Sequence, residues 1–332
     1  MYKVGGLFSG VGGIEQGFQN AGFKISWANE WDKYACITYR ANHSHKLYEE
    51  DIFNLNASKL SPIDILTGGF PCQPFSIAGL RKGFDDDRGN LFHQIMRLVD
   101  EMYSKPKVLF LENVKNFHTH DNGNTYKTVI KELNNRGYST FTKVLNTAEY
   151  TKIPHNRERI FIIGFKDDFG WESSNKITCS STFHSLFPPK PKLNKLKIHN
   201  LLTKTKVEER YYYGSDKYMY SELLSSMKNR DTVYQWRRKY VRENKSNVCP
   251  TLTANMGTGG HNVPLIIDDF GFRKLTPREC FRFQGFDNDF ILPSTLANGK
   301  LYKQAGNSVS VPLIQILADL IKVSLLNPTV NQ

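Results

Sequence analysis

Residues 3–13 read Lys-Val-Gly-Gly-Leu-Phe-Ser-Gly-Val-Gly-Gly, and this stretch decides the fold class. Its first half has the apolar character of a buried strand. Its second half is a glycine-rich turn that leads into an amphipathic helix from Gly13. Glycines in such a turn let the backbone approach a ligand, and the amides of the following helix face that ligand. A tight strand-to-helix turn without a ligand explains this segment alone equally well.

The same alternation continues through the first half of the chain. Strand-like runs occupy 3–8, 23–29, 46–52, 63–68, 108–113, 140–145 and 159–165, and helix-like runs occupy 13–21, 33–41, 91–103 and 126–136. This pattern predicts an α/β fold with an open, mostly parallel, seven-stranded sheet covered by helices on both faces. Ligands then bind at the carboxyl ends of the strands.

The composition changes after about Trp171. Residues 173–250 are rich in Ser, Asn, Lys and Tyr, and their strand–helix alternation is weak, which predicts the start of a second, smaller domain. A final apolar helix over 311–326 is too apolar to be solvated. We therefore expect it to pack back on the first sheet.

Bulk properties narrow the class of protein. The 332 residues suit one large α/β domain plus a smaller one, and 39% hydrophobic residues exclude a globally disordered chain. The formal net charge of +12 favours a polyanionic partner, with nucleic acid as the first hypothesis. A soluble protein that is merely basic would carry the same charge.

The five cysteines form no Cys-x-x-Cys pair, and their number is odd. This argues against a disulfide framework and against a metal site, and reduced thiols fit a cytoplasmic protein. No run approaches about 18 consecutive apolar residues. The sequence thus predicts neither a signal peptide nor a membrane span.

Polar residues follow the second and third predicted strands where a cofactor would lie. Glu30 can accept hydrogen bonds from two ribose hydroxyls, Trp31 can stack on an adenine, and Asp51 can accept from an adenine amino group. Taken singly, each is equally well a capping acid or a packed ring. As a set they predict an adenosine pocket, without separating S-adenosylmethionine from a dinucleotide.

The next two strands end in residues with reactive side chains. Cys72 follows Gly-Gly-Phe-Pro after the fourth strand, where a stiff chain favours a nucleophile over the buried small hydrophobe that a lone cysteine usually is. Glu112 ends the fifth strand, so it should face the same pocket. Arg157 and Arg159, at i and i+2 of an extended segment, share one face and could reach a phosphate or a ring carbonyl, or form an ordinary surface cluster.

These residue types suit chemistry at carbon 5 of cytosine, which is a poor nucleophile. Addition of the Cys72 thiolate at C6 makes C5 enamine-like, and protonation of N3 by Glu112 neutralises the developing charge. Arg159 can hold the O2 carbonyl. A methyl donor above C5 completes the transfer.

The segments 68–76, 112–114 and 304–309, in this order, resemble the cytosine-C5 DNA methyltransferase family of bacterial restriction–modification type. The resemblance implies Cys72 as the covalent catalyst, Glu112 as the N3 partner, and Arg157 and Arg159 as paired catalytic arginines. It implies S-adenosyl-L-methionine as cofactor. The residues that it places at this cofactor are Phe8, Gly10, Gly12, Glu30, Trp31, Asp51, Ile52, Pro71, Leu91, Asn307, Ser308 and Val309.

The resemblance also implies an architecture. Residues 1–174 and 305–332 would form a class I S-adenosylmethionine-dependent, Rossmann-like catalytic domain, 175–272 a target recognition domain, and 273–304 a hinge that supports it. The substrate would be a flipped cytosine in double-stranded DNA, with residues 73–90 as a closing loop. The predicted DNA contacts are Ser76, Arg88, Arg237, Arg238, Thr251 and Leu252.

Two positions depart from the family pattern. Gly6 stands where the family often has Asp, which should loosen the cofactor loop. His155 replaces the usual Gln, which should affect a supporting contact near the flipped base. The enzyme would act as a monomer in the cytoplasm, and it would be encoded by a bacterium or a phage. A restriction endonuclease would be its functional partner. A GCNGC-type recognition sequence is the hypothesis for its target.

Three alternatives differ in substrate or activity. A tRNA cytosine methyltransferase would carry Cys-Phe-Thr in the second domain, which is absent. A nicotinamide dehydrogenase would carry Gly-x-Gly-x-x-Gly, whereas residues 8–13 read Phe-Ser-Gly-Val-Gly-Gly. An inactive DNA-binding module would not need intact Cys72, Glu112 and Arg159.

Overall fold

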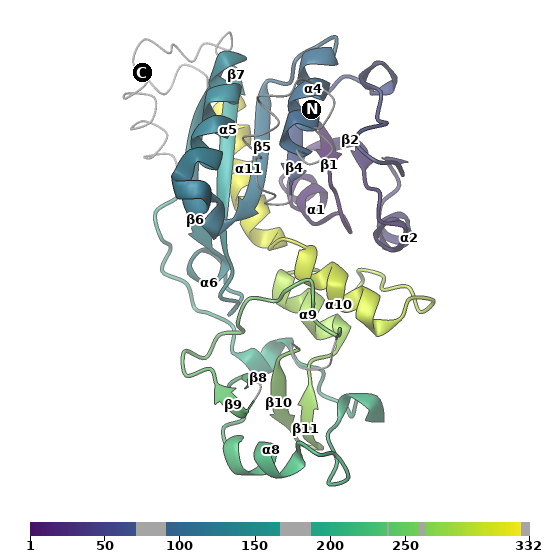
Figure 1. The fold of residues 1–332 in the computed structure, drawn as a ribbon, viewed down its shortest axis with the longest axis vertical. Helices are drawn as coiled ribbons and strands as arrows, with labels where there is room; N and C mark the ends of the chain where they lie inside the picture. Colours follow the sequence, from purple (N-terminus) through teal and green to yellow (C-terminus); the bar gives the residue numbers. More distant parts are fainter. Residues whose placement is uncertain (71–90, 167–186, 238, 259–262, 327–332) are drawn as a thin grey trace.

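A seven-stranded sheet forms the centre of the larger part of the molecule (Figure 1). The computed structural model describes residues 1–70, 91–166, 187–237, 239–258 and 263–326. The strand order is β3-β2-β1-β4-β5-β7-β6. The strands are β1 Lys3–Leu7, β2 Lys24–Asn29, β3 Lys46–Tyr48, β4 Ile65–Gly69, β5 Val108–Val114, β6 Tyr138–Asn146 and β7 Glu158–Lys166.

All seven predicted strands are confirmed, and β3 is shorter than the predicted run 46–52. The chain turns after Tyr48, because Asn29 Nδ2 donates to the carbonyls of Tyr48 and Glu50, and Asp51 Oδ1 then accepts from Phe53 N. The pairs among β1 to β5 are parallel, whereas β7 runs antiparallel to both β5 and β6. The antiparallel edge therefore brings the start of β7 to the same edge as the ends of β4 and β5.

Helices cover both faces of this sheet (Figure 1). On one face α11 packs against α1, where Gly17 lies so close to Ile314 that a Cβ would collide with it. The helices of this part are α1 Gly13–Asn20, α2 Lys33–Asn42, α4 Leu91–Glu101, α5 Asn124–Asn135, α6 Thr147–Tyr150 and α11 Val311–Leu326, with short 3-10 turns at Ala57–Lys59 and Lys115–Gly123. The prediction that residues 311–326 pack back on the first sheet is confirmed.

One helical stretch of the described residues, Asn298–Leu326, is long and apolar enough to cross a membrane by length and composition, although the sequence contains no run of about 18 consecutive apolar residues. The mean hydropathy of an 18-residue window within it is 1.8. It comprises α10 (Asn298–Asn307) and α11, and the buried face of α11 belongs to the same apolar cluster as β1 and β5. Packing in the core accounts for its apolar character.

A four-stranded antiparallel sheet lies at the other end of the molecule (Figure 1). Its order is β11-β10-β8-β9, and α8 packs beside it. α9 and α10 lie between the two sheets. The elements of this part are α8 Tyr220–Ser226, β8 Tyr234–Arg237, β9 Tyr240–Glu243, β10 Leu265–Asp268, β11 Gly271–Lys274 and α9 Pro277–Gln284, with 3-10 turns at Ile198–Leu201 and Glu209–Tyr211. β11 extends two residues past the predicted boundary at 272.

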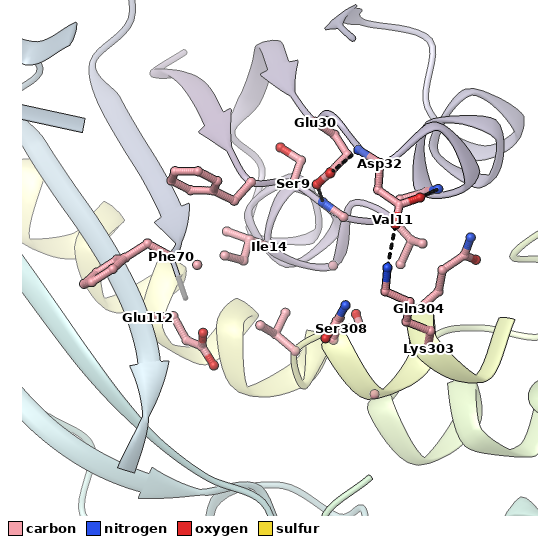
Figure 2. A pocket seen from close by; sticks show the side chains of 18 of the residues that line it. Ser9, Val11, Ile14, Glu30, Asp32, Phe70, Glu112, Lys303, Gln304 and Ser308 are labelled. Carbon is pink, nitrogen blue, oxygen red and sulfur yellow. Dashed lines mark hydrogen bonds and ion pairs between the residues drawn. The ribbon is translucent and has the colours of Figure 1, made fainter. Parts of the chain in front are cut away.

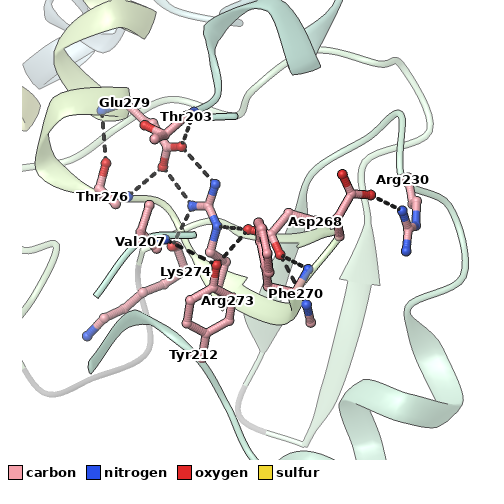
Figure 3. A network of polar contacts seen from close by, with 12 residues as sticks. Thr203, Val207, Tyr212, Arg230, Asp268, Phe270, Arg273, Lys274, Thr276 and Glu279 are labelled. Carbon is pink, nitrogen blue, oxygen red and sulfur yellow. Dashed lines mark hydrogen bonds and ion pairs between the residues drawn. The ribbon is translucent and has the colours of Figure 1, made fainter. Parts of the chain in front are cut away.

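A buried arginine attaches the small sheet to α9 (Figure 3). The side chain of Arg273 is fully buried and donates to Asp268 Oδ2 at 2.5 Å and to both carboxylate oxygens of Glu279 at 2.8 Å. Glu279 also accepts from the amides of Thr276 and Thr203. Removing one partner of such a buried pair would leave an uncompensated charge, so this network fixes how the sheet joins the helix.

Candidate active site

A cavity of about 420 Å³ opens at the carboxyl edge of the large sheet (Figure 2). This volume lies within the range of small-molecule sites, and the position is where open α/β sheets bind ligands. Glu30 and Asp32 lie on one side, and Phe70 and Glu112 on the other. The lining comprises Phe8, Ser9, Gly10, Val11, Gly13, Ile14, Glu30, Trp31, Asp32, Ala35, Gly69, Phe70, Leu91, Glu112, Asn113, Val114, Arg157, Arg159, Lys303, Gln304, Gly306, Asn307, Ser308 and Val309.

The carboxylate of Glu30 holds the glycine loop against the end of β2. Its Oε2 accepts from Gly10 N at 2.7 Å, and its Oε1 accepts from the amides of Trp31 and Asp32 at 2.9 and 2.8 Å. Burial raises the pKa of Glu30, and these three amides oppose that rise by stabilising the carboxylate. Gly10 has a φ of 57°, a left-handed conformation that favours glycine. Oε2, which accepts one hydrogen bond, keeps a further lone pair for a ligand, whereas Oε1 already accepts two.

The rim beside Glu30 is closed by contacts from α10. Asp32 caps α2 by accepting from Tyr34 N and Ala35 N, and its other oxygen pairs with Lys303 Nζ at 2.8 Å. Gln304 bridges to the same helix through the carbonyl of Tyr34. No local sequence pattern indicates this rim, because its two sides are about 270 positions apart in the chain.

Most of the predicted cofactor residues line this cavity. They are Phe8, Gly10, Glu30, Trp31, Leu91, Asn307, Ser308 and Val309. Among the described residues, the lining does not include Gly12, Asp51 or Ile52. Asp51 caps the turn after β3 and Ile52 is buried in the core. Pro71 lies outside the described residues.

The neighbouring strand ends bring an acid and an arginine together. Gly69 of β4 pairs with Glu112 of β5, and Arg159 Nε lies 2.9 Å from Glu112 Oε1. Asn113 Nδ2 donates to the carbonyl of Phe70 at 2.9 Å. β5 therefore fixes the chain two residues before Cys72, which itself lies outside the described residues. The prediction that β4 and β5 end side by side is confirmed.

The two arginines have different surroundings. Arg159 reaches into the cavity beside Glu112, and its side chain is 14% exposed. The side chain of Arg157 is buried and donates to the backbone carbonyls of Leu252, Gly306 and Ser308. Both terminal nitrogens of Arg157 are thus occupied by carbonyls of the protein, so we interpret Arg157 as a positioning residue.

Both departures from the family pattern have a structural explanation. At Gly6 a Cβ would collide with Glu15 Oε1, so the buried carboxyl of Glu15 fills the space that the missing side chain leaves. Glu15 Oε1 accepts from Ser9 Oγ at 2.5 Å within the glycine loop. The Glu15 carboxyl thus holds the glycine loop in place. These contacts do not support the expectation that Gly6 loosens the loop. His155 contacts the backbones of Leu252 and Phe283.

The predicted DNA contacts differ in exposure. Arg237 on β8 and Thr251 are exposed, and Thr251 Oγ1 donates to Asn156 O at 2.6 Å. The side chain of Leu252 is buried in a core cluster, so it can serve DNA binding only by anchoring its segment. Ser76, Arg88 and Arg238 lie outside the described residues.

The fold and the cavity define a class: an α/β protein with a cavity of ligand size at the carboxyl edge of its sheet, beside an acid–arginine pair. Sequence comparison then gives the family. The chain matches the C-5 cytosine-specific DNA methylase family over residues 2–323 and belongs to it. It is therefore a DNA (cytosine-5)-methyltransferase, which decides against the dehydrogenase alternative.

Individual relatives agree with this membership. The chain is 50% identical over 330 residues to the type II methyltransferase M.Bsp6I of Bacillus sp. (strain RFL6), which covers 98% of this chain and 100% of that protein. It is 38% identical over 319 residues to the type II methyltransferase M.HaeII of Haemophilus aegyptius, covering 96% and 92%. Its fold is similar to that of a putative DNA modification methyltransferase encoded within an E. coli prophage, with a TM-score of 0.72, 22% identity, and 98% and 100% coverage.

Proposed function

We propose that this enzyme methylates C5 of one cytosine within a short specific site in double-stranded DNA, through a covalent bond between Cys72 and C6. The observation that carries the proposal is the Glu112–Arg159 pair beside Gly69, three residues before Cys72. An acid and a guanidinium at one strand edge can bind N3 and O2 of the same pyrimidine ring.

The residues have distinct tasks in this reaction. The Cys72 thiolate adds to C6, while Glu112 donates a proton to N3 and Arg159 holds O2, so that C5 becomes nucleophilic. When bound, S-adenosyl-L-methionine would supply the electrophilic methyl group that the activated C5 accepts. Loss of the C5 proton to a base then expels the thiolate, and return of the N3 proton to Glu112 leaves neutral, aromatic 5-methylcytosine.

The cavity fits an adenosyl cofactor in its own features. The ring of Trp31 is 72% exposed at the cavity and can stack on an adenine, and Oε2 of Glu30 can accept from a ribose hydroxyl. Asn307 and Ser308 also line the cavity, and their side chains can offer polar contacts to the amino-acid end of the cofactor. The reaction needs an unstacked cytosine, so the base must flip out of the duplex to reach this edge.

Target recognition is assigned to residues 175–272, with 273–304 as the hinge. The exposed basic side chains on the small sheet, Arg237 among them, suit base edges and phosphates. By analogy with the type II relatives, the enzyme protects DNA in a cytoplasmic restriction–modification system with a partner endonuclease. We propose that it acts as a monomer on a GCNGC-type site, which methylome sequencing of expressing cells would test.

The position of the new methyl group tests the proposed reaction. Purified enzyme is incubated with S-adenosylmethionine and plasmid DNA carrying tritium at C5 of cytosine. The proposal predicts one tritium released for each methyl group transferred, and 5-methylcytosine in the hydrolysate. Methyl transfer without tritium release, as in methylation of the exocyclic amino group, would contradict it.

A further inference from the structure

A short segment before β7, Pro154–Arg157, connects parts of the chain that are far apart in sequence. Cys249 N donates to Pro154 O at 2.6 Å, and Asn156 N donates to Cys249 O at 2.8 Å. His155 and Cys249 thereby form a parallel bridge outside the named strands. The large sheet thus meets the 249–252 segment through backbone bonds, close to the exposed Thr251.

Arg157 extends this connection to the cofactor side. One terminal nitrogen donates to Leu252 O at 3.0 Å, and the other donates to Gly306 O at 3.3 Å and to Ser308 O. Gly306 and Ser308 line the cavity, whereas Leu252 belongs to the predicted recognition domain. Because the guanidinium is planar and rigid, moving one segment strains the bonds to the other.

His155 adds a second link in the same place. Its ring is buried, and burial together with the charge of Arg157 holds its pKa well below the usual value, so the ring is neutral. Its Nε2 accepts from Leu252 N at 3.3 Å, which leaves Nδ1–H to donate to Phe283 O at 2.9 Å. The next residue, Gln284, donates from Nε2 to Ala305 O at 2.7 Å. The contacts of Arg157 and those of His155 therefore both connect Leu252 to residues 305–308 beside the cavity.

We propose that His155 and Arg157 form a coupling hub through which occupancy of the cofactor cavity and ordering of the 249–252 segment stabilise each other. The inference rests on the proposed function, namely a cofactor in the cavity and DNA recognition by residues 175–272. Binding linkage is reciprocal, so the effect of DNA on cofactor affinity equals that of cofactor on DNA affinity. The hub makes Arg157 a positioning residue for methyl transfer.

Hydrogen exchange tests the hub without knowledge of the DNA site. Amide exchange is measured for peptides covering 8–14 and 249–256, with and without saturating S-adenosylhomocysteine. In the wild type, the ligand should slow exchange in both peptides, by about 5-fold or more in 249–256, the lower end of usual allosteric coupling. In Arg157→Met the slowing at 249–256 should fall to less than about 2-fold while that at 8–14 remains.

Further variants separate coupling from loss of structure. Arg157→Lys keeps the charge and loses the forked geometry, so it should weaken the coupling and remain folded if the methionine variant does not. The glutamine in His155→Gln can still accept and donate hydrogen bonds, so this variant should retain the coupling. Arg136→Lys is the matched control, because Arg136 also donates to a backbone carbonyl, that of Glu132, and lies at the end of α5.

The outcomes distinguish the hub from the proposed function. Protection at 8–14 without any at 249–256 in the wild type, or full coupling in folded Arg157→Met and Arg157→Lys, would overturn the hub alone. Absence of protection at 8–14 in the wild type would show that this ligand does not occupy the cavity, and would overturn both the hub and the proposed cofactor site.

Discussion

The two sheets of the molecule differ in how firmly they are built. Strands of the large sheet are up to nine residues long and enclose extensive apolar clusters on both faces. Strands of the small sheet have four residues each, and the cluster beneath them is small. Chemistry needs side chains held within fractions of an ångström, whereas reading DNA needs an exposed surface that can differ between relatives.

This comparison predicts that chemistry and sequence preference are separable. Changes at the edge of the large sheet should alter methyl transfer or cofactor binding and leave site preference intact. Changes on the small sheet should do the reverse. The hub of His155 and Arg157 is the place where the two properties should change together.

The largest effect is expected from Cys72→Ser. Loss of the thiolate should lower the rate of methyl transfer by about 10⁴-fold or more, the scale seen when a nucleophile is removed from an enzyme. The preference for the cognate duplex over single-base variants should stay within about 2-fold of that of the wild type, because base recognition is assigned to residues 175–272. Rates come from transfer of labelled methyl groups, and Cys36→Ala, which alters a buried cysteine outside the cavity lining, is the control. Substantial transfer by Cys72→Ser would contradict the assignment.

The next effect concerns the pH dependence of stability, which should change when Glu15, the buried acid that contacts the glycine loop, is replaced. Burial raises the pKa of Glu15 to about 7, against the Ser9 hydrogen bond that lowers it, with Glu30 adding a smaller rise. Since the folded pKa exceeds the unfolded value of 4.5, this group stabilises the fold below pH 4.5, and that contribution is lost as the pH rises to 7. The glutamine in Glu15→Gln does not titrate. Its free energy of unfolding relative to that of the wild type should therefore rise by about 3 kcal/mol between pH 4.5 and pH 8.

Urea unfolding at several pH values measures this gain. Glu101→Gln is the control, because its carboxylate is 44% exposed and pairs only at the surface with Arg97. An equal stability difference between wild type and Glu15→Gln at pH 4.5 and at pH 8 would show that Glu15 is not buried beneath the loop.

A somewhat smaller effect is expected from Glu30→Ala. The lost charged hydrogen bonds should weaken S-adenosylmethionine binding by about 1.5–3 kcal/mol. Calorimetry measures the affinity, and a duplex-binding assay should show unchanged site preference. Because Glu30 also holds Gly10 N, Glu30→Gln should recover part of the affinity. Unchanged binding of the cofactor by Glu30→Ala would remove this carboxylate from the pocket.

The smallest effect is expected on the small sheet. Arg237 is exposed at the end of β8, where its guanidinium contacts Gln235. If it reads a guanine, Arg237→Ala should cost about 1–3 kcal/mol at one base position. Lys239→Ala should instead weaken all duplexes alike and flatten the salt dependence. Binding to a panel of single-base variants at two salt concentrations separates them, and a uniform loss for both would make this sheet a general DNA clamp.

The same contrast explains what the sequence could predict. The period of the apolar residues and the glycine loop indicated the large sheet, and the helix over Val311–Leu326 was predicted at its observed bounds. Four-residue strands are too short to show a period of two, so β8 to β11 were not predicted individually.

Burial explains the other limits. Sequence places Arg157 and Arg159 in one motif, yet only the packing of 249–252 and 306–308 shows that Arg157 is held by carbonyls. Likewise, Glu15 fills the space beside Gly6 because α1 packs against the loop. Such pairings depend on contacts between distant segments, which a local pattern does not contain.

Covalent trapping tests whether Cys72 forms a bond to the target cytosine. A duplex with 5-fluorocytosine at the target position is incubated with the enzyme and S-adenosylmethionine, because fluorine at C5 prevents the proton loss that would release the enzyme. The proposed mechanism predicts a denaturation-resistant complex whose peptide map places the linkage at Cys72, and no complex with Cys72→Ser. Absence of an adduct with the wild type, or a linkage at another residue, would contradict it.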